Sequence, residues 1–210
     1  MIERLNPRYN VRISQRDGDS WKVLSESHNI LTNVGRTWLR DLIGVIAYPS
    51  PIPASGWIEG SSYVKTSERI GWVAFGVGGS LSSAPYYASQ DELVTVTAPE
   101  DWVQITATDY LKQVNVQSAS AGSYPDDYTM LFHIDLQAGD IAFSGNTSKS
   151  GAAVGTSVPV SEVMLYLTGA DKTNNPDHAT NTARGVAYNI FSPVTITPDV
   201  DIRLEWEFRF

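Results

Sequence analysis

The last ten residues of the chain constrain its fold more than any other stretch, because they alternate without a break. Apolar residues occupy every even position of 202–210, and charged residues occupy every odd position of 201–209. A period of two is typical of a β-strand with one buried and one wet face, whereas a helix would spread these apolar side chains around its circumference. We therefore expect a strand whose Trp206 and Phe208 enter the core. Its charged face should stay wet or pair with charges across a sheet.

Length and composition favour one β-rich domain spanning residues 1–210. A chain of 210 residues can bury a sizeable core without disulfides or other staples. Charged residues make up 18% of the chain, below the roughly 25% usual in soluble proteins, so Ser, Thr, Asn and Gly supply much of the polarity. No internal repeat and no linker of distinct composition divides the sequence.

Composition also excludes several classes of function. The chain has no cysteine, which rules out disulfides, thiolate metal sites and cysteine nucleophiles. A net charge of -8 with scattered Lys and Arg argues against a nucleic-acid partner. Residues 1–7 lack the apolar core of a signal peptide, and no run approaches the roughly 20 apolar residues of a membrane span. We expect a protein made and folded in a cytoplasm, without a membrane partner.

Alternating and apolar runs predict eight to ten strands, which favour an antiparallel, jelly-roll-like β-sandwich. The turn signal Asp17-Gly18-Asp19-Ser20 predicts a hairpin between its flanking strands. The stretch 70–77 is apolar on both faces and predicts a strand covered on both sides. Pro193 is expected to stop the strand that begins at Gly185. Besides the C-terminal strand, the predicted strands are 9–16, 21–24, 70–77, 93–97, 102–116 with a bend between 108 and 112, 128–136, 158–168 and 185–191.

One short helix is predicted near residues 33–46. Apolar residues recur there at three- and four-residue spacing, Thr32 or Asn33 can cap the start, and Gly44 with three following prolines ends the pattern. The helix is expected to pack across the sandwich. Five long loops complete the predicted fold, at about 47–66, 78–92, 117–127, 137–157 and 169–184.

The sequence offers no constellation for catalysis, cofactor binding or metal binding. The three histidines lie outside metal-binding spacings, and the His133–Asp135 pair on one strand face has no nucleophile in an elbow context. The Gly76-Val77-Gly78-Gly79 run lacks the features of a phosphate loop, so a turn with positive φ is expected there.

Carboxylate pairs leave two alternatives open. The adjacent pairs Asp91-Glu92, Glu100-Asp101 and Asp126-Asp127 are typical of solvated loops, but a hydrolase needs only two carboxylates that meet in space. A pocket that brings together two of the four acids at 91, 92, 126 and 127 would favour a hydrolase. Asp126-Asp127 or the 171–177 loop offers oxygen ligands of the kind that calcium prefers, although EF-hand spacing is absent.

Aromatic residues are the best candidates for contact with a partner. Six Trp and ten Tyr offer flat apolar area with a polar tip, which suits protein interfaces and sugar stacking alike. Four tryptophans on predicted elements, at 21, 38, 72 and 206, are expected in the core. The candidates for partner contact, in or beside loops, are Trp57, Tyr63, Tyr86, Tyr87 and Trp102.

Three segments in fixed order resemble structural proteins of tailed-bacteriophage virions. The first is 29–42, which holds an "Asn…Gly-Arg…Leu" helix start; the second is 70–80, an apolar strand that runs into a glycine turn. The third comprises 160–167 and then 183–194, with an "Ala-Arg…Phe-x-Pro-Val" pattern before the closing strand. The family's "Glu-x-Gly-Leu" is here Glu162-Val163-Met164-Leu165, without the glycine.

The resemblance implies a non-enzymatic virion component of the neck, tail, baseplate or capsid surface. Its partners would be other copies of itself, arranged as a symmetric homo-oligomer, and other virion proteins. It would be assembled in the host cytoplasm and located in the virion, and it would need no cofactor. The alternative function is a carbohydrate-binding module for host recognition, which would use exposed loop aromatics.

Overall fold

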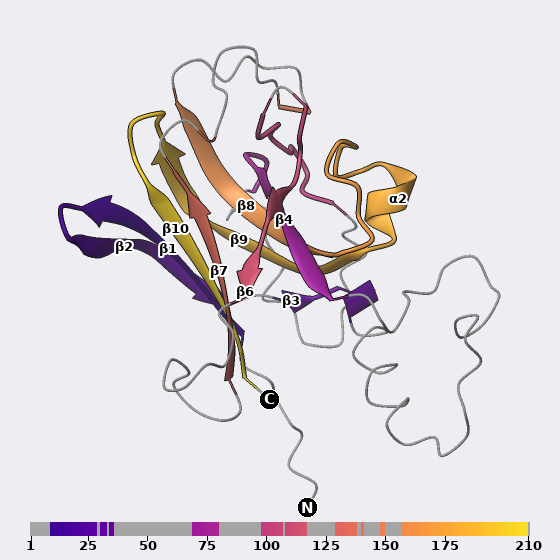
Figure 1. Cartoon of the computed structure of the whole chain (residues 1–210), viewed down its shortest axis with the longest axis horizontal. Coiled ribbons are helices and arrows are strands. Elements are labelled where there is room, and N and C mark those ends of the chain that lie inside the picture. Colours follow the sequence, from indigo (N-terminus) through magenta and orange to yellow (C-terminus); the bar gives the residue numbers. More distant parts are fainter. Residues whose placement is uncertain are drawn as a thin grey trace, which may run out of the picture.

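Two five-stranded antiparallel sheets pack face to face to form a β-sandwich (Figure 1). The computed structural model describes residues 9–28, 30–32, 34–35, 69–79, 98–106, 108–116, 129–137, 140, 148–149 and 157–209. Strands follow the order β2-β1-β10-β7-β6 in the first sheet and β3-β9-β8-β4-β5 in the second. This architecture confirms the predicted mainly β fold, an antiparallel sandwich.

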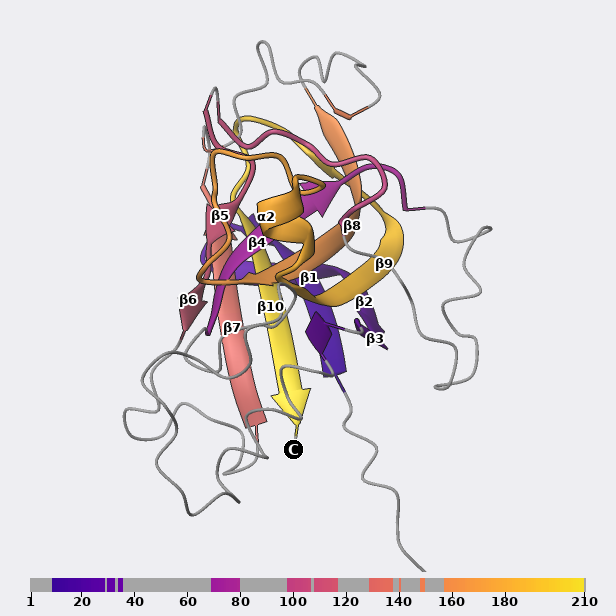
Figure 2. The same cartoon turned by 90° about the vertical axis from the view of Figure 1, so that its right-hand side faces the viewer.

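The strands of the first sheet are β1 (Tyr9–Asp17), β2 (Ser20–His28), β6 (Asn115–Val116), β7 (Thr129–Leu136) and β10 (Ile202–Arg209). The strands of the second sheet are β3 (Ile30–Leu31), β4 (Ile70–Gly76), β5 (Lys112–Gln113), β8 (Val158–Leu167) and β9 (Gly185–Ile196). A short helix, α2 (Ala179–Thr182), lies within the segment predicted as the loop 169–184. Figure 2 shows α2 beside the second sheet, on the side away from the first.

The C-terminal residues form the strand β10, as their alternation predicts, and β10 lies in the middle of the first sheet. It pairs with β1 on one side and with β7 on the other. Ile202, Leu204 and Trp206 are almost completely buried between the sheets, whereas Arg203 and Glu205 face outward and remain partly exposed. The predicted burial of Phe208 falls outside the described side chains.

Short strands that change sheets close both sides of the sandwich. On one side the chain leaves β2 in the first sheet and enters β3 in the second; on the other it leaves β5 in the second and enters β6 in the first. Such switches make corners between packed sheets. The free end of the β1–β2 hairpin projects beyond the sandwich (Figure 1).

β4 confirms the prediction of a strand covered on both faces. Val73 and Phe75 belong to the main core between the sheets. Ala74 faces the other way, into a second apolar cluster on the outer face of the second sheet. The buried members of this cluster are Ala74, Leu111, Met164, Tyr166, Ala170 and Tyr188.

Two strand predictions are wrong, each for a local reason. The run 102–116 is not one bent strand: Trp102 and Val103 bond to the end of β4, the chain then turns, and it pairs with β4 again as β5. Pro193 does not stop β9, which continues to Ile196. The β8–β9 register shifts between Val160 and Glu162, so Pro193 lies in an irregular stretch where its missing N–H breaks no ladder bond.

Two further predictions concern residues 21 and 33–46. Trp21 is not a core residue: it lies on the outer face of the first sheet, where the Arg203 guanidinium sits 4.4 Å from its ring centroid. For the predicted helix, Val34 and Gly35 are helical, and Thr32 Oγ1 accepts a hydrogen bond from Gly35 N at 3.0 Å, as a helix cap does. Residues 36–46 lie outside the described residues.

Other predictions also fall outside the described residues. These are the strand 93–97, the loops 47–66 and 117–127, the acids Asp91, Glu92, Asp126 and Asp127, and four of the five candidate contact residues, Trp57, Tyr63, Tyr86 and Tyr87.

Candidate contact site around Trp102

Trp102 is the candidate contact residue that the structure describes, and its backbone is fixed on two sides. It forms a bridge with Gly76 at the end of β4, and Val103 N donates to Phe75 O at 2.8 Å. On the other side Lys149 N donates to Trp102 O at 3.0 Å. Trp102 therefore lies at the end of the second sheet, with a defined backbone position.

The Trp102 side chain is partly buried and meets a second aromatic ring. Its ring lies at 89° to that of Tyr110, in an edge-to-face contact with 5.1 Å between centroids. Such a contact stabilises the pair, but two perpendicular rings do not form one flat platform. The indole Nε1 is buried and meets no acceptor with full hydrogen-bond geometry among the described residues.

A carboxylate and an ammonium group lie beside these rings. Asp177 Oδ2 forms an ion pair with Lys149 Nζ at 3.0 Å. Partial burial acts to raise the pKa of Asp177, but Lys149 and the nearby indole N–H of Trp102 outweigh it, so the pKa is lowered. The side chains of Asp177 and Lys149 remain 33% and 45% exposed, so both belong to the surface.

A turn places Tyr110 next to Trp102. Asp109 N donates to Thr106 Oγ1 at 2.9 Å, and Ile105 N donates to Asp109 O at 2.8 Å. Leu111 then enters the second apolar cluster, while Lys172 Nζ pairs with Asp109 Oδ2 at 2.8 Å. Trp102, Tyr110, Lys149, Asp177, Lys172 and Asp109 together form what we call the Trp102 site.

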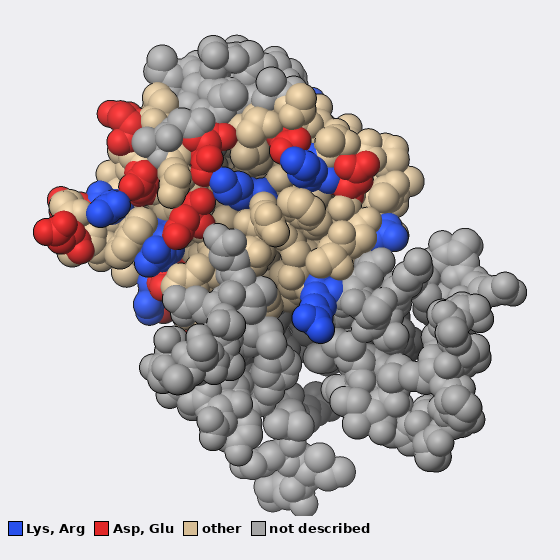
Figure 3. Space-filling model, viewed as in Figure 1, with Lys and Arg blue, Asp and Glu red and all other residues tan. Residues whose placement is uncertain are grey.

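On the face shown in Figure 3, charges of both signs are interspersed over the described residues, and no single-sign field dominates that face. An aromatic centre with a mixed polar rim is typical of protein–protein contacts. It also offers an aromatic ring and a carboxylate to a sugar. Sequence reasoning singled out Trp102 but missed Tyr110, Lys149 and Asp177, which lie between 8 and 75 positions away in the sequence.

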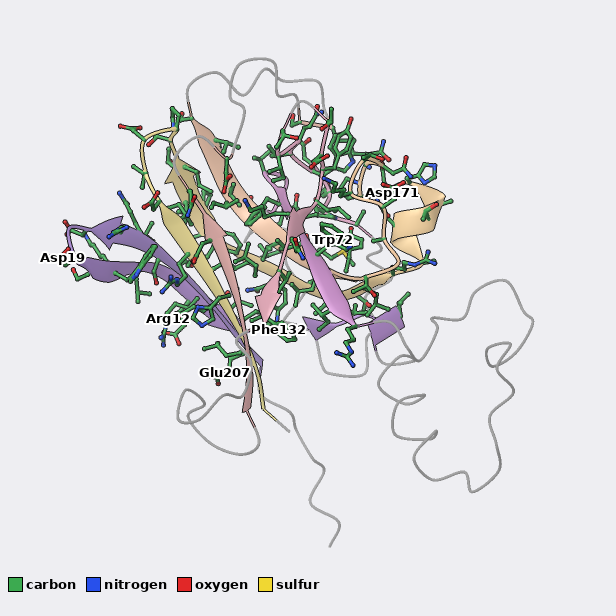
Figure 4. All side chains as sticks on the ribbon, in the orientation of Figure 1. Arg12, Asp19, Trp72, Phe132, Asp171 and Glu207 are labelled. Carbon is green, nitrogen blue, oxygen red and sulfur yellow. The ribbon has the colours of Figure 1, made fainter. Side chains whose placement is uncertain are left out.

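The 171–181 segment beside the site is held by its own polar groups. The buried Asn181 Oδ1 accepts from Asp171 N at 2.8 Å, and its Nδ2 lies 3.0 Å from the carbonyl oxygens of Asp171, Asn174 and Asn175. Hydrogen bonds from the N–H and hydroxyl of Thr173 lower the pKa of Asp171. Figure 4 places Asp171 beside α2.

This segment does not bring carboxylates together for calcium. Asp171 is engaged by Thr173, whereas Asp177 pairs with Lys149. Across the described ranges, no group of three or more His, Asp or Glu residues could hold a metal ion.

Glu162 anchors the backbone beneath Trp102, and sequence reasoning missed this role. Its fully buried carboxylate accepts from Gly78 N at 2.8 Å and Asp101 N at 2.9 Å through Oε1. Oε2 accepts from Glu100 N at 2.8 Å and Tyr188 OH at 2.6 Å. The one signal in the sequence is an acid inside an otherwise apolar run.

The expectation of a positive-φ turn at Gly78 and Gly79 is wrong. Among the described glycines, only Gly18 in the hairpin turn has positive φ, at 61°. Positions 78 and 79 require glycine because other atoms approach too closely to leave room for a Cβ. A Cβ on Gly78 would lie 2.8 Å from Asp101 N, and one on Gly79 would lie 2.5 Å from Ser161 O.

The histidine–aspartate pair proposed on β7 does not form. Asp135 Oδ1 accepts from Arg203 Nε at 2.7 Å, and Oδ2 accepts from Arg203 Nη2 at 3.1 Å. His133 Nε2 lies 3.8 Å from Glu205 Oε1 and has no hydrogen-bond partner among the described residues.

In comparisons with known proteins, no family model, no curated protein and no solved structure matches the chain. None of the helices in the described ranges is long and apolar enough to span a membrane.

Proposed function

We propose that the protein is a non-enzymatic structural subunit of a tailed-bacteriophage virion. It contributes symmetric contacts between copies in the neck, tail, baseplate or capsid surface. The observation that carries this proposal is that the segments behind the resemblance to such proteins touch one another in the fold. They are therefore parts of one structural unit, which supports the proposal.

The first and third segments meet at Thr32. Its Oγ1 donates to Gly185 O at 2.6 Å, and its N–H donates to Val186 O at 3.1 Å. Gly35, three residues on, lies directly against Val186 O, and a Cβ there would collide with that oxygen. Thr32 and Gly35 of the first segment are thus tied to β9, the strand that follows "Ala-Arg" in the third.

The second and third segments meet at Glu162. Gly76 pairs with Glu162 across β4 and β8, and Gly78 donates to its carboxylate. The glycines after the apolar strand and the acid of the later motif therefore form one contact. Polar groups buried at these junctions fasten chain segments together, which suits a rigid subunit whose surface makes the contacts.

Two measurements test this proposal. Native mass spectrometry of the purified protein is expected to give a symmetric homo-oligomer, and immunogold electron microscopy of particles from the same source is expected to label one defined position. A protein that remains monomeric at high concentration and is absent from particles would overturn it.

Carbohydrate binding is the second candidate, and the Trp102 site favours it. Trp102 and Tyr110 lie beside the Asp177 carboxylate, which offers ring contact and a hydrogen-bond acceptor to a sugar. Glycan-array binding that Trp102→Ala abolishes and Trp21→Ala preserves would favour this function. If the protein binds no glycan on the array, carbohydrate binding is rejected and only the virion proposal remains.

A further inference from the structure

The Glu162 carboxylate is buried, and no cationic side chain pairs with it among the described residues. Glu162 takes part in none of the ion pairs found within the described residues. Three backbone N–H groups and one hydroxyl surround it instead, and together they fill the acceptor capacity of a carboxylate. A buried anion held by converging backbone N–H groups resembles the anion-binding nests formed by other backbone segments.

The glycines near Glu162 make room for this arrangement. A Cβ on Gly76 would lie 2.5 Å from Glu162 Oε1, and a Cβ on Gly78 would lie 2.9 Å from the same oxygen. Glycine is the residue that allows such close approach of backbone to a bound group. The Gly76-Val77-Gly78-Gly79 run is therefore shaped around a carboxylate.

We propose that the backbone of Gly78, Glu100 and Asp101 forms a carboxylate receptor, that Glu162 is its internal ligand, and that Glu162 thereby positions Trp102. We call residues 98–103 the strap. Its Glu100 and Asp101, the two residues directly before Trp102, each donate a backbone N–H to the Glu162 carboxylate. The strap also receives Val77 N–H at Asp101 O, at 2.8 Å. The part of the inference that concerns contact at Trp102 rests on the proposed function; the receptor itself does not.

This role differs from that of an ordinary buried polar residue. Apolar packing beneath the strap tolerates sliding, whereas two hydrogen bonds from the strap to the Glu162 carboxylate fix the register of the strap against β4 and β8. Removing the carboxylate leaves three N–H groups facing an empty position. A small carboxylate from solution is then the chemical class that the position should take.

The test uses Glu162→Ala in the full chain, with formate as the probe and neutral formamide as its matched control. Amide hydrogen exchange is read at Gly78, Glu100 and Asp101. We expect exchange at these amides to accelerate by about tenfold or more, while amides of the β1–β10 ladder keep their wild-type rates. Formate should restore protection and shift the Trp102 indole N–H resonance back toward its wild-type position, and formamide should do neither.

Two controls keep the result decisive. Glu205→Ala removes a carboxylate from the outer face of the other sheet and should leave the three amides unchanged. If Glu162→Ala fails to fold, Glu162→Gln takes its place in the test. The NH2 group of the glutamine side chain faces at least one of the receptor N–H groups and cannot accept a hydrogen bond from it. Wild-type protection in the variant that folds, or equal rescue by formate and formamide, would overturn the proposal. These readouts need only the isolated protein, so their failure is separate from failure of the virion role.

Discussion

Arg12 on β1 lies directly opposite Glu205 on β10, and Arg12 Nη1 approaches Glu205 Oε2 to 3.8 Å. The same row continues across the sheet in both directions. Glu26 on β2 pairs with Arg12 at 3.2 Å, and His133 on β7 lies opposite Glu205. On the outer face of the first sheet, Glu26, Arg12 and Glu205 thus form a row of alternating charge, which confirms that the charged side of β10 pairs across strands.

Charge reversal at Arg12 tests this row. Arg12→Ala should destabilise the fold by less than about 1 kcal/mol, because the Arg12 side chain is exposed and solvent screens both of its ion pairs. Arg12→Glu should destabilise it by roughly twice as much, since it places three carboxylates in a row and like charges opposite each other repel. Urea unfolding measures both. Lys22→Glu, an exposed change on β2, is the matched control; an equal effect there would contradict the row's importance.

The pKa of His133 predicts how stability changes with pH. Burial is the largest influence and lowers this pKa from its ordinary value of 6.5, outweighing Glu205 and Asp135, which raise it; Arg203 also lowers it. The unfolded chain therefore binds a proton at higher pH than the folded chain, so stability is lost as pH falls from 6.5 through the lowered folded pKa. Above pH 6.5 both states are neutral at this position and the contribution is flat.

Thermal unfolding across that pH window checks the sign. His133→Gln should remove part of the loss seen on acidification. A wild-type protein that gains stability on passing below pH 6.5 relative to His133→Gln would contradict the prediction.

The fold was predictable where side-chain period and burial agree. β10 and β7 alternate strictly, and Phe132, Ile134 and Leu136 are buried as their spacing requires. Trp21 shows the limit of this argument. The β1–β2 register shifts between Ile13 and Ser14, so a face assigned from one half of β2 does not carry into the other half.

The candidate site was predictable only in part, because its contacts join distant segments. Glu162 lies 84 positions from Gly78 and 61 from Asp101, and no local pattern announces that their atoms meet. A single buried acid produces no periodic pattern in the sequence. Its partners are backbone N–H groups, which every residue except proline possesses, so residue identity carries no signal of them.

Loss of the Trp206 side chain should destabilise the fold more than any substitution on the outer face of the first sheet. Its side chain is fully buried in the main core, so Trp206→Ala should destabilise the fold by about 3–5 kcal/mol, a large share of the total stability of a typical domain. Trp21→Ala loses an exposed cation–π contact, which is worth about 0.5–1 kcal/mol. Guanidinium unfolding compares the two; similar losses would contradict the assignment of Trp206 to the core.

Gly18 and Gly79 should respond differently to substitution, because each is glycine for a different reason. Gly18 has φ 61° and open space around its Cα, so Gly18→Asn should be nearly neutral and Gly18→Ala should cost about 1 kcal/mol. Gly79 is crowded by Ser161 O, a backbone atom of β8 that cannot move alone, so Gly79→Ala should destabilise by about 1–3 kcal/mol and Gly79→Asn by at least as much. Chemical unfolding of the four variants measures this contrast. A tolerated Gly79→Asn would mean that close approach to β8 does not require glycine there.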